Sequence, residues 1–213
     1  MRKKFSIKGL ADYMTATPSR QRTIIRQYKY PQEDEGRAKI HYYREARDLI
    51  AAYHTAGKRR AWIEGEALRL DSIAAYSNRW SKARLENNAR AVRAYSKHFG
   101  GRDFVVLDDL NLGLEYGDVL VTVRPDLHVI EKDKEKIIKL EFATKAPDPL
   151  MVKIIAQGMF EAAIEEGMDL KSAQVLYLDV LSGKEHKGAR LGARMRKDMA
   201  AACDTISDIW PSI

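Results

Sequence analysis

Two β-rich runs flank a short charged turn in this chain, and that pattern limits the folds available to it. Val119–Val129 is mostly apolar or β-branched, and Lys136–Ala143 forms a second such run. Between them lies the charged segment Glu131–Glu135, which reads EKDKE. Strand-length runs joined by so short a polar turn predict an antiparallel hairpin.

The expected hairpin carries one acidic residue on each strand, Asp126 and Glu141, at similar distances from the turn. Folding at the turn is expected to bring their carboxylates within roughly 4–7 Å, a gap that one cation with oxygen ligands at about 2.0–2.6 Å can bridge. Paired carboxylates suit hard divalent cations. The hairpin therefore predicts a metal site at Asp126 and Glu141.

Helical periodicity and its breakers predict the other elements. Ser6 is expected to cap the first helix, and Pro18 to lie in the first turn of the second. The expected helices cover residues 7–14, 19–28, 38–56, 59–76, 79–98, 150–166 and 189–210, and further strands are expected at 104–107, 110–116 and 173–181. Residues 32–36 are expected to be a polar linker and 182–188 a loop.

This order of elements predicts an α/β fold with a helical N-terminal half. Residues 1–102 are expected to be a helical region packed on an α/β core of residues 103–213, in one compact unit. With the helix that precedes it, the core has the order α-β-β-β-α-β. A mixed sheet of about four strands is therefore expected.

Positive charge lies on either side of the hairpin in the sequence. The net charge is +7 and the pI about 9.4. Basic residues concentrate in residues 1–30, which include Arg20, Arg22 and Arg26, and in residues 184–197. Such a distribution fits a polyanionic partner.

Several protein classes are disfavoured by the sequence. The longest apolar runs are far shorter than the roughly 18 residues that a membrane helix needs. The basic N-terminus has no apolar segment typical of a signal peptide. Cys203 is the one cysteine, which excludes an internal disulfide and a cysteine-only metal site. The chain is therefore expected to be cytoplasmic, with no membrane partner.

The hairpin region resembles the core of the PD-(D/E)xK nuclease superfamily, in particular its RecB-like members. Pro125-Asp126 matches the first motif element and Glu141 the acidic residue of the second, while Gln157 stands where RecB-like members often carry glutamine. The resemblance covers roughly residues 103–181 and includes the restriction-endonuclease-like order α-β-β-β-α-β. One position departs from it, because Ala143 stands where the motif has lysine.

This resemblance implies a metal-dependent hydrolase of DNA phosphodiester bonds. Asp126 and Glu141 would hold Mg²⁺ or Mn²⁺, and Lys145 would replace the missing lysine, with Lys139 on the same strand face as an alternative. Gln157 would hydrogen-bond the site or the substrate. Arg20, Arg22 and Arg26 would contact the DNA backbone.

Two other functions stay open. Ala143 favours a catalytically inactive nuclease-fold module that binds nucleic acid or a partner protein. A helical interaction protein that binds a protein partner or a second copy of itself, without nucleic acid, is the third.

Structural roles are also open for each candidate residue. Pro125-Asp126 suits a strand edge, Lys145 a solvated strand end and Gln157 a helix surface. Glu141 lies in a largely apolar run, where a carboxylate needs a partner. His128 shares a strand face with Asp126, and Glu115 and Asp118 are weaker candidates for a third metal ligand.

Overall fold

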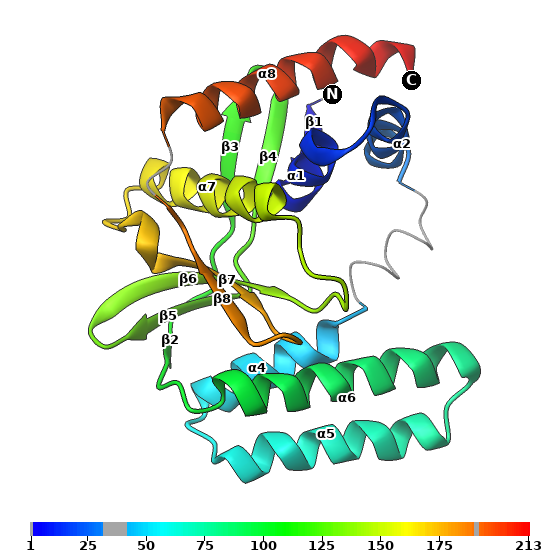
Figure 1. Cartoon of the computed structure of the whole chain (residues 1–213), viewed down its shortest axis with the longest axis vertical. Coiled ribbons are helices and arrows are strands. Elements are labelled where there is room, and N and C mark those ends of the chain that lie inside the picture. Colours follow the sequence, from blue (N-terminus) through cyan, green and yellow to red (C-terminus); the bar gives the residue numbers. More distant parts are fainter. Residues whose placement is uncertain (1, 32–41, 190–191) are drawn as a thin grey trace.

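The computed structural model describes residues 2–31, 42–189 and 192–213. Within them the chain has an α/β fold with seven α-helices and eight strands (Figure 1). The helices are α1 (Ile7–Thr15), α2 (Pro18–Lys29), α4 (Arg44–Thr55), α5 (Arg60–Ala75), α6 (Arg79–Phe99), α7 (Pro149–Glu165) and α8 (Ala193–Ile209), with 3-10 turns η1 (Ser172–Gln174) and η2 (Trp210–Ser212). The strands are β1 (Lys3–Ser6), β2 (Val105–Val106), β3 (Leu112–Tyr116), β4 (Val119–Val123), β5 (Leu127–Glu131), β6 (Lys134–Glu141), β7 (Val175–Asp179) and β8 (Lys184–Lys187).

The strands form two sheets. One has the order β1-β4-β3, with β1 parallel to β4. The other has the order β2-β5-β6-β7-β8, and β6 and β7 are its parallel pair. The expectation of about four strands in one sheet was therefore wrong.

The expected long strand over residues 119–129 is divided at Arg124-Pro125-Asp126. Residues 119–123 pair within the three-stranded sheet, whereas residues 127–131 pair with β6 in the five-stranded sheet. Pro125 has no N–H to give to a strand ladder, so the run breaks at this residue. Pro125-Asp126 is thus the point at which the chain passes from one sheet to the other.

The expected hairpin is confirmed as β5 and β6. Its two turn residues, Lys132 and Asp133, have φ angles of 52° and 58°. Positive φ at both positions is the geometry of the two-residue turns that match the twist of antiparallel strands.

The five-stranded sheet lies between two groups of helices (Figure 1), and an apolar cluster lies on each side of it. Ile137 and Tyr177 face the cluster formed with α1, α7, α8 and the three-stranded sheet. Ile138 and Leu178 face the cluster formed with α4, α5 and α6. Alternating side chains of a buried strand reach opposite faces, so both faces of this sheet are covered by helices.

Local signals set several of the helix N-termini. The Ser6 hydroxyl accepts a hydrogen bond from the Gly9 N–H at 3.0 Å and caps α1, as expected. Pro18 begins α2, and Asp148 caps α7. The first residues of the helix expected over 38–56, and the linker expected over 32–36, lie outside the described residues. Helix α4 begins at Arg44.

Two short strands contradict the sequence expectations. β1 precedes α1, so the first half of the chain is not helical throughout. β8 lies in the segment expected to be a loop, residues 182–188. Its sequence, KEHK, is polar because it is a sheet edge, and it therefore lacks the apolar alternation that marks a strand.

Candidate functional site

Asp126 and Glu141 both lie at the open end of the β5–β6 hairpin, in different local settings. Asp126 is in the bend before β5, outside the paired residues, and its N–H donates to the Ile138 carbonyl at 2.8 Å. Glu141 is the last residue of β6, on the same side of the strand as Lys139. Lys139 in turn contacts the Asp126 carboxylate.

The Asp126 carboxylate has three donors around it. Oδ2 accepts from the Leu140 N–H at 2.8 Å and lies 2.9 Å from the Lys139 Nζ. Oδ1 lies 3.3 Å from the Nε of Arg47, on α4. Only 7% of the Asp126 side chain is exposed, so these partners replace the water that a buried carboxylate loses.

Glu141 is held by a different set of donors. Its Oε2 lies 2.7 Å from the Lys8 Nζ and accepts from the Tyr177 hydroxyl at 2.9 Å. Its Oε1 accepts from the backbone N–H groups of Phe142 and Ala143, at 3.0 and 3.1 Å. The side chain therefore ties together α1, β7 and the end of its own strand.

These backbone contacts explain where β6 ends. The Glu141 carboxylate takes the N–H groups of the next two residues, so neither can continue a strand ladder. Lys145 consequently lies on the loop between β6 and α7, where it is exposed. The alternation that would align Lys145 with Glu141 stops at Glu141, whereas Lys139 does reach the site.

Helix α1 brings two more charged groups to Glu141. Lys8 and Asp12 are four residues apart, so they lie on one face of the helix. Burial raises the pKa of Asp12, Lys8 and Arg20 oppose this, and the negative charge of Glu141 raises it again. Asp12 is thus an acidic neighbour of the site that the sequence did not reveal.

The pKa of Glu141 is lowered despite its burial. Burial raises it, but the charge of Lys8 and hydrogen bonds from Lys8, Tyr177 and Ala143 together bring it below its usual value. Burial and the adjacent Glu141 charge raise the pKa of Tyr177. At neutral pH Tyr177 is therefore a neutral hydroxyl that donates to a carboxylate.

A pocket of about 290 Å³ opens over this group, between α1, α4 and the end of β6. Three cations line it, Lys8, Arg47 and Lys139, against a single carboxylate, that of Glu141. Its other walls are the aromatic residues Tyr42, Tyr43 and Phe142 and the segment residues Leu140 and Ala143. Tyr43 stacks on Phe142 with ring centroids 4.9 Å apart. Arg47 and Lys139 also contact the Asp126 carboxylate beside the pocket. The pocket thus joins three cations, each with a carboxylate partner, to aromatic surface.

The donor set does not fit a divalent cation in this arrangement. Oδ2 of Asp126 and both oxygens of Glu141 each receive two donors already. A carboxylate oxygen has two lone pairs, so a cation would have to displace Lys139 or Lys8. No group of three or more His, Cys, Asp or Glu side chains suited to a metal occurs in residues 2–31, 42–189 and 192–213.

The structure places Gln157 in a contact other than the expected one. It is buried on α7, and its Nε2 donates to Glu161 one turn later. Glu161 also accepts from the Tyr116 hydroxyl at 3.2 Å and the Arg196 Nε at 3.0 Å. Gln157 therefore belongs to a polar cluster that joins α7 to β3 and α8, and it does not lie on the helix surface.

The three basic residues singled out on α2, Arg20, Arg22 and Arg26, are all exposed. Arg20 is close enough to Asp12 for its charge to oppose the raised pKa of that carboxyl. The first turn of α2 therefore lies near the Lys8 side of the pocket. Of the basic residues expected near the C-terminus, Arg190 lies outside the described residues.

The remaining candidates lie in other contacts. The Nδ1 of His128 lies 2.9 Å from the Asp108 carbonyl and its Nε2 lies 2.7 Å from Glu135. Glu115 pairs with Arg2 at 2.6 Å, and Asp118 contacts Lys3 and Ser207. These three residues hold the hairpins and termini together and do not join Asp126 or Glu141.

Comparison with known proteins adds no identity. No family model matches this sequence, and no curated protein matches it either. Within the described part of the chain, no helix is both long enough and apolar enough to cross a membrane. The site must therefore be interpreted from its own residues.

Sequence reasoning missed four residues of the site: Lys8, Asp12, Arg47 and Tyr177. Only the spacing of Lys8 and Asp12 marked a shared helix face in the sequence. The contacts of Lys8 and Tyr177 with Glu141 span 133 and 36 positions, and no local pattern encodes such separations.

Proposed function

We propose that this chain is a nucleic-acid-binding protein that holds a backbone phosphate of single-stranded DNA in the pocket lined by Lys8, Arg47 and Lys139. This is the second of the functions that the sequence leaves open, a catalytically inactive nuclease-fold module that binds nucleic acid. The observation that carries the proposal is the charge of this pocket, three cations against one carboxylate. An anion is the ligand that such a pocket favours.

The three basic side chains of the pocket are accessible to a ligand. The Lys8 side chain is 46% exposed, so its pairing with Glu141 is weak and exchangeable. Lys139 and Arg47 have side chains that are 19% and 35% exposed and reach the pocket from two elements. A phosphate oxygen would compete with the carboxylates for these donors without a change in the backbone.

Aromatic residues favour a single strand over a duplex. Tyr42 and Tyr43 lie in the same pocket as the cations, and unpaired bases stack on such rings. Basic grooves that combine backbone contacts with stacking surfaces are typical of single-strand binding. The exposed arginines of α2 extend the positive surface beyond Lys8.

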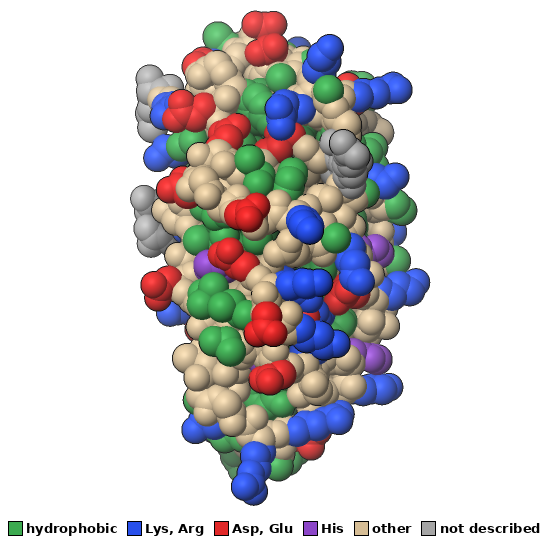
Figure 2. Space-filling model, turned by 90° about the vertical axis from the view of Figure 1, so that its left-hand side faces the viewer, with side chains coloured by type: hydrophobic (Ala, Val, Ile, Leu, Met, Phe, Trp, Pro, Cys, Tyr) green, Lys and Arg blue, Asp and Glu red, His purple; other side chains and the backbone are tan. Residues whose placement is uncertain are grey.

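Positive charge alone would be a weaker argument. The face in Figure 2 carries Lys and Arg side chains near mid-height, but Asp and Glu side chains lie among them. In the pocket the cations outnumber the carboxylate and surround a cavity. This local excess, and not the net charge of +7, supports the proposed phosphate site.

A matched pair of lysines tests the proposal. Lys139 and Lys136 both lie on β6, both pair with a buried carboxylate, and their side chains are 19% and 17% exposed. Only Lys139 lines the pocket. Binding of a labelled single-stranded oligonucleotide is measured by fluorescence anisotropy over a series of salt concentrations for Lys139→Met and Lys136→Met.

Lys139→Met is expected to weaken binding roughly fivefold at about 0.1 M salt, since each phosphate contact on a single strand contributes about −0.7 to the salt slope. Lys136→Met is expected to bind as wild type does. Equal affinities and slopes for both variants would rule out the pocket. Arg20, Arg22 and Arg26 changed together to Glu are expected to weaken binding and flatten the slope as well.

Metal-dependent cleavage is the second candidate, because Asp126 and Glu141 both lie at the open end of the β5–β6 hairpin. Incubating wild type with single-stranded and duplex DNA, with and without Mn²⁺, separates the two functions. Binding without cleavage supports the first. Cleavage that Asp126→Asn and Glu141→Gln both abolish supports the second, and Lys145→Ala then tests whether the exposed loop lysine takes part.

A further inference from the structure

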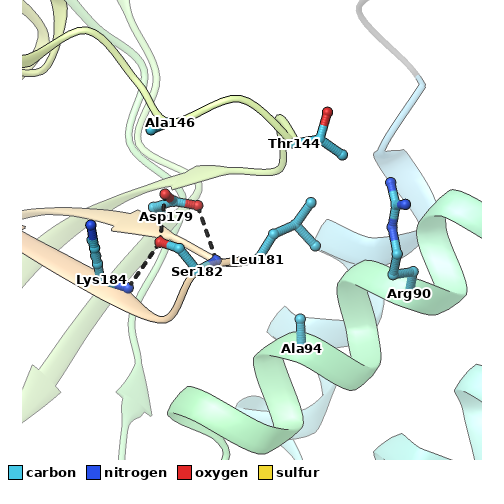
Figure 3. Close-up of a pocket in the computed structure, with 8 residues that line it drawn as sticks. All are labelled: Arg90, Ala94, Thr144, Ala146, Asp179, Leu181, Ser182 and Lys184. Carbon is cyan, nitrogen blue, oxygen red and sulfur yellow. Dashed lines mark hydrogen bonds between the residues drawn. The ribbon is translucent and has the colours of Figure 1, made fainter.

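A second pocket, of about 360 Å³, lies between α6, the loop after β6 and the turn that joins β7 to β8 (Figure 3). The loop of residues 142–146 separates it from the first pocket, since Ala143 lines one and Thr144 the other. The two pockets therefore border the same loop, and the strand proposed for the first pocket is inferred to reach the second. A role for the second pocket in base recognition rests on the proposed function and extends it.

The distinctive group in this pocket is the carboxylate of Asp179. The residue is 3% exposed, and its oxygens accept from the Ser182 hydroxyl at 2.6 Å and the Ser182 N–H at 3.3 Å. None of the ion pairs formed within residues 2–31, 42–189 and 192–213 includes it. A buried carboxylate without a cation favours a ligand that brings hydrogen-bond donors.

Asp179 differs in this respect from the carboxylates of the first pocket. Asp126 and Glu141 each have a basic side chain beside them. Ser182 uses one lone pair on each Asp179 oxygen and leaves one on each. Two adjacent acceptors of this kind match a group with two parallel N–H donors.

The surroundings fit a nucleotide in size and chemistry. Figure 3 shows Asp179 between two basic side chains, Lys184 from β8 on one side and Arg90 from α6 on the other. Leu181 and Ala146 supply apolar surface. The volume lies within the range of small-molecule sites, about 300–1,000 Å³.

We propose that this pocket binds an unstacked guanine of the bound strand. The guanine N1–H and N2–H₂ groups lie side by side on one edge and donate to the two oxygens of Asp179. Adenine, cytosine and thymine lack this pair of adjacent donors. Arg90 and Lys184 face the phosphates on either side of the base, as unpaired bases are read on their exposed edges while basic side chains hold the backbone.

The experiment compares two oligonucleotides, an all-dT 12-mer and the same 12-mer with one central dG. A single guanine is expected to raise the affinity of wild type about tenfold, within the range of a good bidentate contact. Asp179→Asn is expected to abolish this preference, because the amide turns a donor toward the guanine donors, and to leave the all-dT affinity unchanged.

A second variant blocks the pocket without changing Asp179, and so distinguishes loss of the pocket from a folding defect. Ala146 is exposed, so Ala146→Leu fills the pocket without disturbing buried contacts, and it should also abolish the guanine preference. A preference that survives in both variants, or one that is absent in wild type, would overturn the inference.

Titration with dGMP and dAMP separates this inference from the proposed function. If no oligonucleotide binds but dGMP binds in an Asp179-dependent manner, the guanine pocket stands and the single-strand proposal fails. If strands bind without any preference and dGMP does not bind, the single-strand proposal stands and the guanine pocket fails.

Discussion

The two ends of the β5–β6 hairpin each hold a partly or fully buried carboxylate paired with basic side chains, but they differ in what surrounds the pair. At the turn end, Arg102 donates to both oxygens of Glu131, at 2.7 and 2.6 Å, and Lys136 contacts the same carboxylate. At the open end, Asp126 and Glu141 have Lys139 and Lys8 as partners. Neither of the two pockets is lined by Arg102, Glu131 or Lys136.

The difference shows that an ion pair in this fold is not by itself evidence of a site. Arg102 is fully engaged, since its third nitrogen donates to Glu185 at 2.6 Å. Arg102, just before β2, thus joins Glu131 on β5 to Glu185 on β8, and this bidentate network stabilises the fold. At the open end Lys8, Arg47 and Lys139 border a cavity as well as their carboxylate partners, and the proposed phosphate site rests on this difference.

The largest expected effect lies at the turn end. Arg102→Met would leave Glu131, which is 8% exposed, with Lys136 alone and Glu185 with Lys187 alone. Removing one partner of a buried pair costs about 3–5 kcal/mol of unfolding free energy. Urea unfolding at neutral pH measures this loss.

DNA binding supplies the control for Arg102→Met. The variant that remains folded at low temperature is expected to bind the single strand with wild-type affinity. A folded Arg102→Met protein that no longer binds DNA would mean that both ends of the hairpin belong to one site.

The two ends should also respond differently to pH. His54 lies near Arg102, is buried, and its Nε2 lies 2.7 Å from the Tyr95 hydroxyl. Burial, and then the charge of Arg102, lowers its pKa to about 4. In the unfolded chain His54 is protonated below about pH 6.5, whereas in the folded chain it stays neutral down to about pH 4.

The contribution of neutral His54 to the free energy of unfolding is therefore fully present above about pH 6.5. It is lost as the pH drops toward 4, by about 2 kcal/mol at pH 5. Urea unfolding at pH 7.5 and pH 5.0 measures the difference, and His54→Gln should remove most of it. Glu141, with its lowered pKa, does not titrate in this interval. An unchanged pH dependence in His54→Gln would assign the acid sensitivity to other groups.

Local patterns predicted the parts of the fold that depend on neighbouring residues. The hairpin, the Ser6 cap and the helices α5, α6 and α7 follow from periodicity, capping residues and breakers, all within a few positions. The pairing of β1 with β4 joins residues more than a hundred positions apart. Such pairing leaves no mark on a four-residue strand, which explains why β1 was missed.

The site was predicted only in part for the same reason. The predicted hairpin placed Asp126 and Glu141 near its open end, and strand alternation placed Lys139 on the Glu141 side of β6. It could not show that Glu141 would bond its own next two N–H groups and end the strand before Lys145. Nor could it show that α1 lies against the end of β6 and supplies Lys8.

The smallest effect compares two buried tyrosines. The Tyr177 hydroxyl donates to the Glu141 carboxylate at 2.9 Å, whereas the Tyr95 hydroxyl lies 2.7 Å from His54, which is neutral at pH 7. Both residues are at most 1% exposed. Hydrogen bonds to charged groups contribute about 1.5–3 kcal/mol, and those between neutral groups about 0.5–1.5 kcal/mol.

Tyr177→Phe is expected to cost about 1.5 kcal/mol, at the low end of the charged range, because Glu141 keeps Lys8 and two backbone donors. Tyr95→Phe should cost less. The two variants should also differ in pH dependence. The Tyr177 hydrogen bond helps to lower the pKa of Glu141, so its contribution is present above about pH 4.5 and is lost as Glu141 is protonated at lower pH. Urea unfolding of both variants at pH 7 and pH 3.5 provides the measurement. A Tyr177→Phe deficit that persists unchanged at pH 3.5 would show that the hydroxyl acts through packing and not through the charge of Glu141.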